Sequence, residues 1–249
     1  MRRAALFLWS FIYMSAGLSG AEFWETKSLA EWSDKDIQKL VTNSPWARQT
    51  KGVADGATES TPFDTASGIP QAGLGRASEG LGASGPGASN TPAPFDSATR
   101  AAAVIPEVSV TVRWLSALPM RQAQMRAKYG KEADASPAAK QYLETEPVYY
   151  TIGVSGVPGL YLSAYGGDRA KELIQKFTTL TLKGKEPLRP VAVQFVPNGP
   201  NIDVLIAFPR SGAITLADQD VDFSGRLGTL GVHYRFRLKD MVARGKLEL

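Results

Sequence analysis

The clearest pattern in the chain is Val232-His233-Tyr234-Arg235-Phe236-Arg237-Leu238-Lys239, in which apolar and polar side chains alternate. An alternation with a period of two is typical of a β-strand that buries one face. We therefore predict a strand over residues 230–239 that turns its apolar side chains toward a core and its basic side chains toward solvent.

The basic row of this strand is the most coherent polar surface in the sequence. We interpret Arg235, Arg237 and Lys239 as candidate contacts for an acidic protein or an anionic polymer of the cell envelope. The alternative is an ordinary solvated face that pairs with acidic residues of a neighbouring strand. His233 belongs to the same row, and we do not predict it to be catalytic because local spacing places no Ser or Asp beside it.

An acidic row precedes the basic one, since Asp218, Asp220 and Asp222 alternate along a strand predicted over 219–224. This spacing is also found at the start of calcium-binding loops, but Phe223 stands where an EF-hand needs Gly and Thr229 where it needs Glu. A solvated acidic face is favoured over a looser cation site. If the acids lie opposite a basic strand, they would form cross-strand ion pairs.

Before these two rows, some segments show the apolar pattern of strands and others show that of helices. Further strands are predicted over 108–114, 148–154, 179–183, 191–196 and 202–208, with Pro197-Asn198-Gly199-Pro200-Asn201 as a hairpin turn. Helices are predicted from Pro119 to Gly130, after Ser136-Pro137 and after Asp168. This order predicts an α+β fold over 106–249, with a mainly antiparallel sheet and about three helices.

A short Trp-rich segment, residues 22–50, comes before this domain. Ser33 and Asp36 have the spacing of a capping box and predict a short N-terminal helix over 34–42. One short helix is too small to bury Trp24, Trp32 and Trp46 together, so these side chains either dock on the C-terminal domain or contact a partner. We therefore count the tryptophans as candidate partner contacts.

Residues 51–105 are rich in Gly, Pro, Ala, Ser and Thr, and they show no sustained helical or strand period. Such a composition offers too little apolar area to offset the entropy of ordering the chain. We predict a disordered linker.

The first 21 residues have the pattern of a secretory signal peptide. Arg2 and Arg3 precede an apolar run from Ala4 to Met14, and small residues follow. Cleavage is predicted before Glu22, with a cut after Gly20 as the alternative. An uncleaved anchor is the alternative, although the run is shorter than the roughly 20 apolar residues of a spanning helix. No later stretch has that length, so we expect a periplasmic or extracellular protein without a membrane span in the mature chain.

Several terminal motifs carry a resemblance to a known family. They are Phe23-Trp24-Glu25, Trp32-Ser33 with Asp36, Ser44-Pro45-Trp46, Phe236-Arg237-Leu238-Lys239-Asp240-Met241 and Gly245-Lys246-Leu247-Glu248-Leu249. Together they resemble an uncharacterised family of bacterial secreted proteins. The resemblance implies export and two blocks around a variable middle, and it implies no activity, cofactor or site residue.

Composition excludes several kinds of chemistry. The chain has no Cys and one His, which excludes disulfides, thiol catalysis, cysteine-ligated metals and histidine clusters. The net charge at pH 7 is +4, and it falls to +2 without Arg2 and Arg3, which is too small to indicate a nucleic-acid protein. Gly153, Gly156 and Gly159 follow a strand but have neither phosphate-loop spacing, so we interpret them as turn glycines.

These observations favour a secreted or periplasmic, non-catalytic binding or protein-interaction module of unknown ligand. We predict no catalytic residue, no cofactor and no metal site. The alternatives are a carboxylate-based hydrolase of the cell envelope, whose acids need no local motif, and a small-molecule carrier.

Overall fold

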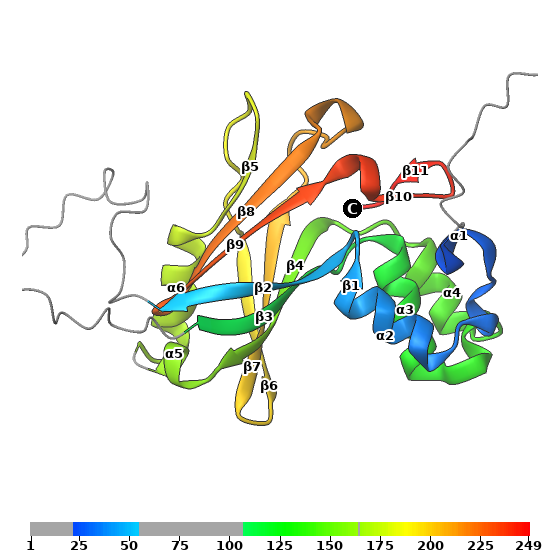
Figure 1. Ribbon diagram of the computed structural model, residues 1–249, viewed down its shortest axis with the longest axis horizontal. Helices are drawn as coiled ribbons and strands as arrows, with labels where there is room; N and C mark the ends of the chain where they lie inside the picture. Colours follow the sequence, from blue (N-terminus) through cyan, green and yellow to red (C-terminus); the bar gives the residue numbers. More distant parts are fainter. Residues whose placement is uncertain (1–21, 55–106, 164) are drawn as a thin grey trace, which may run out of the picture.

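The computed structural model describes residues 22–54, 107–163 and 165–249, and it has helices packed on a curled antiparallel sheet (Figure 1). The predicted α+β class with a mainly antiparallel sheet is confirmed. The predicted signal peptide over 1–21 and residues 55–105 of the predicted linker lie outside the described residues.

The main sheet follows one path through eight strands, each antiparallel to its neighbours. In spatial order they are β5 (Thr179–Leu182), β8 (Asp220–Leu227), β9 (Leu230–Arg237), β2 (Ala47–Ala54), β3 (Glu107–Trp114), β4 (Tyr149–Pro158), β7 (Asn201–Pro209) and β6 (Ala192–Asn198). The short strand β1 (Asn43–Ser44) pairs with β2, and β10 (Val242–Ala243) forms a separate hairpin with β11 (Lys246–Leu247). The predicted hairpin at Gly199-Pro200 joins β6 to β7.

One connection links the two ends of this strand order. Leu188 exchanges backbone hydrogen bonds with Leu180 of β5, and the Val191 N–H donates to the Ala207 carbonyl of β7 at 2.8 Å. Residues 183–191 therefore span from one end of the curled sheet to the other.

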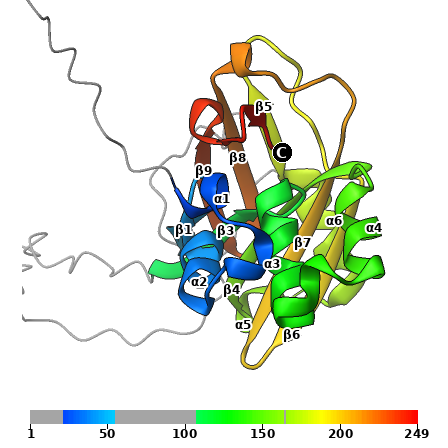
Figure 2. The ribbon, with the colours of Figure 1, turned by 90° about the vertical axis from the view of Figure 1, so that its right-hand side faces the viewer.

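Helices gather at two ends of the sheet (Figures 1 and 2). One group contains α1 (Phe23–Thr26), α2 (Asp34–Thr42), α3 (Leu118–Tyr129), α4 (Pro137–Glu144) and the 3-10 turns η1 (Leu29–Glu31) and η3 (Gly130–Asp134). The other contains α5 (Leu160–Ser163) and α6 (Gly167–Phe177), and α6 contacts β6 and β8.

Aromatic rings of several strands pack against one another in the core. Trp114 of β3 is fully buried and makes edge contacts with Tyr150 at 5.7 Å and Phe236 at 5.1 Å, measured between ring centroids. Phe236 is one of the predicted inward residues of β9. The predicted alternation of buried and exposed side chains is confirmed along this strand.

The acidic strand starts later, and the basic strand stops earlier, than the sequence predicts. β9 stops at Arg237, and residues 238–240 form the 3-10 turn η5 (Leu238–Asp240), so Lys239 lies beyond the strand. β8 starts at Asp220, and Asp218 lies in the 3-10 turn η4 (Leu216–Asp218). A tight corner causes both differences, because Gln219 adopts a left-handed φ of 63° and its carbonyl accepts the Leu238 N–H at 2.8 Å.

The N-terminal segment is part of the main core. Trp24, Trp32 and Trp46 are 6%, 1% and 0% exposed, and the Trp46 indole N–H donates to the Glu248 carbonyl at 2.8 Å. β2 extends this segment to Ala54, between β9 and β3. Residues 51–54 of the predicted linker instead complete a strand. Of the two alternatives for the tryptophans, the structure shows docking on the chain's own C-terminal part.

The capping box of α2 leads to a prediction about pH. The Ser33 N–H donates to the Asp36 carboxylate at 3.0 Å, and this bond, aided by Lys27 at 2.9 Å, holds the pKa of Asp36 below its usual value. A lowered pKa means that the ionised carboxylate stabilises the folded state at neutral pH, and this contribution disappears as the pH falls through the folded-state pKa.

We therefore expect the stability difference between the parent protein and Asp36→Asn to be largest near pH 7 and to shrink below about pH 4. Urea unfolding of both proteins between pH 7 and pH 3 measures this difference. Parallel pH profiles would contradict the assigned role of the carboxylate.

Candidate binding cleft

A cleft forms where two neighbouring strands of the sheet separate. β2 pairs with β3 from Ala47 to Val53, but it pairs with β9 only from Gly52 to Ala54. Because β3 occupies one edge of β2, the short strand β1 lies on the other edge, toward β9. β1 and β9 are not paired with each other, and the cleft lies between them.

This cleft has a volume of about 760 Å³, within the range of about 300–1,000 Å³ that is usual for ligand sites. Its lining comes from α1, β1, β2, β9 and the segment after β9. The lining residues are Glu22, Trp24, Glu25, Asn43, Ser44, Pro45, Arg48, Tyr234, Arg235, Arg237, Asp240 and Val242.

The strand walls of the cleft are basic. Arg235 forms a bidentate pair with Asp222 of β8, with its Nε 2.7 Å from Oδ1 and its Nη2 3.1 Å from Oδ2. Arg237 makes no ion pair or side-chain hydrogen bond with the described part of the chain, although Asp220 is its cross-strand neighbour. The charge of Arg235 is therefore balanced by Asp222, whereas the charge of Arg237 has no such partner in the described part of the chain.

Arg48 supplies a third guanidinium from β2. It donates to the side-chain oxygen of Asn43 and also hydrogen-bonds the Tyr234 side chain. Burial raises the pKa of Tyr234 above its usual value, and Arg48 and Arg237 oppose this shift. The tyrosine hydroxyl stays protonated at neutral pH beside these cations.

The opposite rim of the cleft carries acidic residues that are largely engaged. Glu22 pairs with Lys39 at 2.6 Å, and the Glu25 carboxylate accepts the Arg244 backbone N–H at 2.8 Å. Asp240 instead follows β9 within η5, on the same wall as Arg237, and forms no ion pair with the described part of the chain. Positive charge that is available to a ligand is therefore concentrated at Arg48 and Arg237.

The structure brings together three of the six residues singled out from the sequence. Trp24, Arg235 and Arg237 line the cleft, whereas Lys239 is exposed and outside its lining. Trp32 and Trp46 lie in the core, where no partner can reach them. The sequence did not indicate Arg48, because residues 47–54 have no alternating pattern.

The acidic row lies opposite the basic strand, as the ion-pair alternative predicts. Asp222 and Asp220 are in register with Arg235 and Arg237, and His233 Nε2 lies 3.6 Å from Asp222. Asp218 instead pairs with Lys185 at 2.7 Å, and this cation lowers the pKa of Asp218. Among the described residues, no group of three or more His, Asp and Glu side chains could hold a metal ion.

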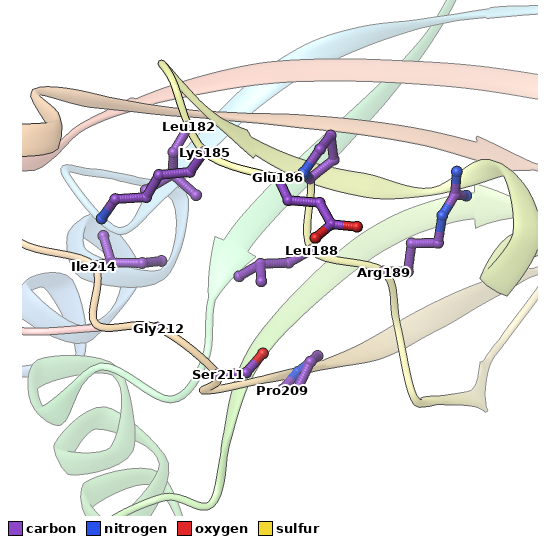
Figure 3. A pocket seen from close by; sticks show the side chains of 10 residues that line it. Leu182, Lys185, Glu186, Leu188, Arg189, Pro209, Ser211, Gly212 and Ile214 are labelled. Atoms are coloured by element: carbon purple, nitrogen blue, oxygen red, sulfur yellow. The ribbon is translucent and has the colours of Figure 1, made fainter.

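A second pocket, of about 590 Å³, lies between the connections β5–β6 and β7–β8 (Figure 3). Lys185 and Ile214 lie at one end of it and Arg189 at the other, with Leu188 between them. The Lys185 ammonium is held by Asp218 and by the Ala213 carbonyl at 3.1 Å. The Lys185 ammonium group therefore already links the β5–β6 connection to the β7–β8 connection.

Comparisons of the chain with protein-family models, curated protein sequences and solved structures found no match. In the described ranges, no helix has the length and apolar character needed to cross a membrane.

Proposed function

We propose that this protein is a secreted or periplasmic, non-catalytic binding module that recognises an acidic partner through the cleft between β1 and β9. Export is supported by the basic start and apolar run of residues 1–21 and by the resemblance of the terminal blocks to a secreted family. The observation that carries the proposal is the pair of guanidinium groups, Arg48 and Arg237, in a cleft whose acids are mostly engaged.

Guanidinium groups suit this role because each presents five donors in a planar fork that matches a carboxylate or phosphate. Arg235 uses two of its donors on Asp222 and keeps the others. A ligand carboxylate near Arg237 would therefore gain a charge-assisted hydrogen bond without displacing an existing ion pair.

The carrier and hydrolase alternatives have less support. A carrier would need an apolar cavity among the inward side chains of the sheet, where Trp114, Phe223 and Phe236 are fully buried instead. A hydrolase would need a pair of cleft acids, and in this cleft Glu22 and Glu25 are held by Lys39 and Arg244.

Binding of poly-L-glutamate to the chain from Glu22 to Leu249 tests the proposal. We expect titration calorimetry to show binding that weakens as salt rises, because the contacts are between exposed charges. The double variant Arg48→Gln/Arg237→Gln should bind at least about tenfold more weakly, since each charge-assisted bond contributes about 1.5–3 kcal/mol.

The matched control removes two exposed charges from the helical end of the molecule, in Lys131→Gln/Lys140→Gln. Its affinity should stay within about twofold of the parent once the change in net charge is screened by salt. Equal losses in the two double variants would show non-specific attraction and would contradict the assigned cleft.

A further inference from the structure

The edge of β9 that faces the cleft is free of a strand partner. β9 pairs with β8 along its whole length, from Leu230 to Arg237, but with β2 only as far as Val232. Residues 233–237 therefore have one paired edge and one edge that faces the cleft.

Two observations establish which backbone groups lie on the free edge. In an antiparallel strand, the N–H and C=O of one residue point to the same side, and those of the next residue point to the other. The His233 carbonyl accepts the Thr50 hydroxyl of β2 at 3.3 Å, whereas the Leu238 N–H faces β8 and donates to Gln219. Arg235 and Arg237 thus direct their backbone groups toward the cleft, and Tyr234 and Phe236 toward β8.

The two strands that border the cleft run in the same direction. β1 is antiparallel to β2, and β2 is antiparallel to β9, so β1 and β9 are parallel to each other. One incoming strand can therefore lie antiparallel to both walls, which is the relation that every strand of this sheet has with its neighbours.

The side chains of β9 indicate which residues such a strand would carry. On its paired edge, β8 places Asp222 opposite Arg235 and Asp220 opposite Arg237. Acidic residues of an incoming strand at the same level would meet these arginines from the other edge. Arg48 lies on the opposite face of the sheet, with Tyr234, because Gly52 of β2 is in register with Val232 of β9. The intervening residues would meet the apolar part of the lining, Trp24, Pro45 and Val242.

We propose that the cleft binds an extended segment of a partner protein, with alternating acidic and apolar residues, as an added antiparallel strand beside β9. Backbone hydrogen bonds at Arg235 and Arg237 hold the segment, and the arginine side chains select its acidic residues. This inference rests on the proposed function and specifies the chemistry and geometry of its ligand.

Amide hydrogen exchange, followed by NMR, tests the free edge directly. In the free protein, we expect the amides of Arg235 and Arg237 to exchange at least about tenfold faster than those of Tyr234 and Phe236. Equal protection of all four amides would show that the edge is already covered and would overturn the proposal.

The probe for binding is the acetylated and amidated peptide Glu-Val-Glu-Val-Glu. At saturation it should slow the exchange of the Arg235 and Arg237 amides at least about tenfold and leave Tyr234 and Phe236 unchanged. The same peptide with Lys in place of Glu is the charge control and should not bind.

N-methylated peptides separate strand pairing from attraction between charges. Residues directly opposite Arg235 and Arg237 exchange hydrogen bonds with them, and in the proposed register these are glutamates. N-methylation of the glutamates should therefore weaken binding at least about tenfold, whereas N-methylation of the valines should weaken it by less than about threefold.

The outcomes distinguish this inference from the proposed function. Equal binding of both methylated peptides would overturn the added strand and leave recognition by the arginines intact. Binding of poly-L-glutamate without any binding of the alternating peptide would also overturn the added strand and leave recognition by the arginines intact. If neither probe binds, both the inference and the proposed function are wrong.

Discussion

Replacing Trp46 by alanine is expected to lower the free energy of unfolding by about 3–5 kcal/mol. Trp46 is fully buried, its ring lies 5.5 Å from that of Trp24, and its indole N–H donates to the Glu248 carbonyl. The substitution leaves a cavity and deprives the carbonyl of its donor. It therefore weakens the contact between the first and last described segments of the chain.

Urea unfolding of Trp46→Ala, followed by circular dichroism, measures this loss. The control is Leu216→Ala, which removes an exposed apolar side chain and should change stability by less than about 1 kcal/mol. A loss below about 1 kcal/mol in Trp46→Ala would show that residues 22–54 do not belong to the core. The cleft would then lose the wall that β1 and α1 provide.

The substitution Gly228→Ala is expected to cost more than about 3 kcal/mol, because it combines backbone strain with a collision. Gly228 lies in the turn between β8 and β9 with a left-handed φ of 66°, and an added Cβ would lie 1.9 Å from the Tyr161 carbonyl oxygen. That oxygen also accepts the Thr229 N–H at 3.3 Å. The collision is with backbone, so rotation of a side chain cannot relieve it.

Gly199→Ala is the matched control for this prediction. Gly199 also begins a hairpin turn, with a φ of 61°, but an added Cβ there has no atom within 4 Å. We expect only the strain of the left-handed conformation, about 1–2 kcal/mol. Thermal and urea unfolding of both variants gives the comparison, and equal losses would contradict the close approach of the β8–β9 turn to α5.

Sequence patterns predicted most of the sheet but missed its central strand. β9 and β3 alternate because each buries one side chain in two, and this period is visible without knowledge of the fold. β2 does not alternate. Gly52 takes an inward position there because Leu230 of β9 fills the space, with its side chain 2.9 Å from where a Cβ would lie. The apolar side chain at this point of the core comes from β9, so the sequence of β2 alone does not show that β2 is a strand of the sheet.

The candidate site was predictable only where it lies on a regular strand. The alternation of β9 singled out Arg235 and Arg237, and their shared exposure followed from the period. Lys239 fitted the same period but lies past the strand end, because the corner at Gln219 stops the pairing with β8. The place of Arg48 in the cleft could not be predicted. It depends on the pairing of β2 with β3 and on the early end of its pairing with β9, and both involve residues far away in the sequence.

The most direct test of this account is the pattern of cross-strand nuclear Overhauser effects around β2. We predict contacts between β2 and β3 from Ala47 to Val53, but contacts between β2 and the β9 backbone only from Gly52 to Ala54. Backbone contacts of Arg48 or Gln49 with residues 235–237 would close the cleft and contradict the account. Absence of any contact between β2 and β3 would contradict it at an earlier step, because the N-terminal segment would then not be part of the sheet.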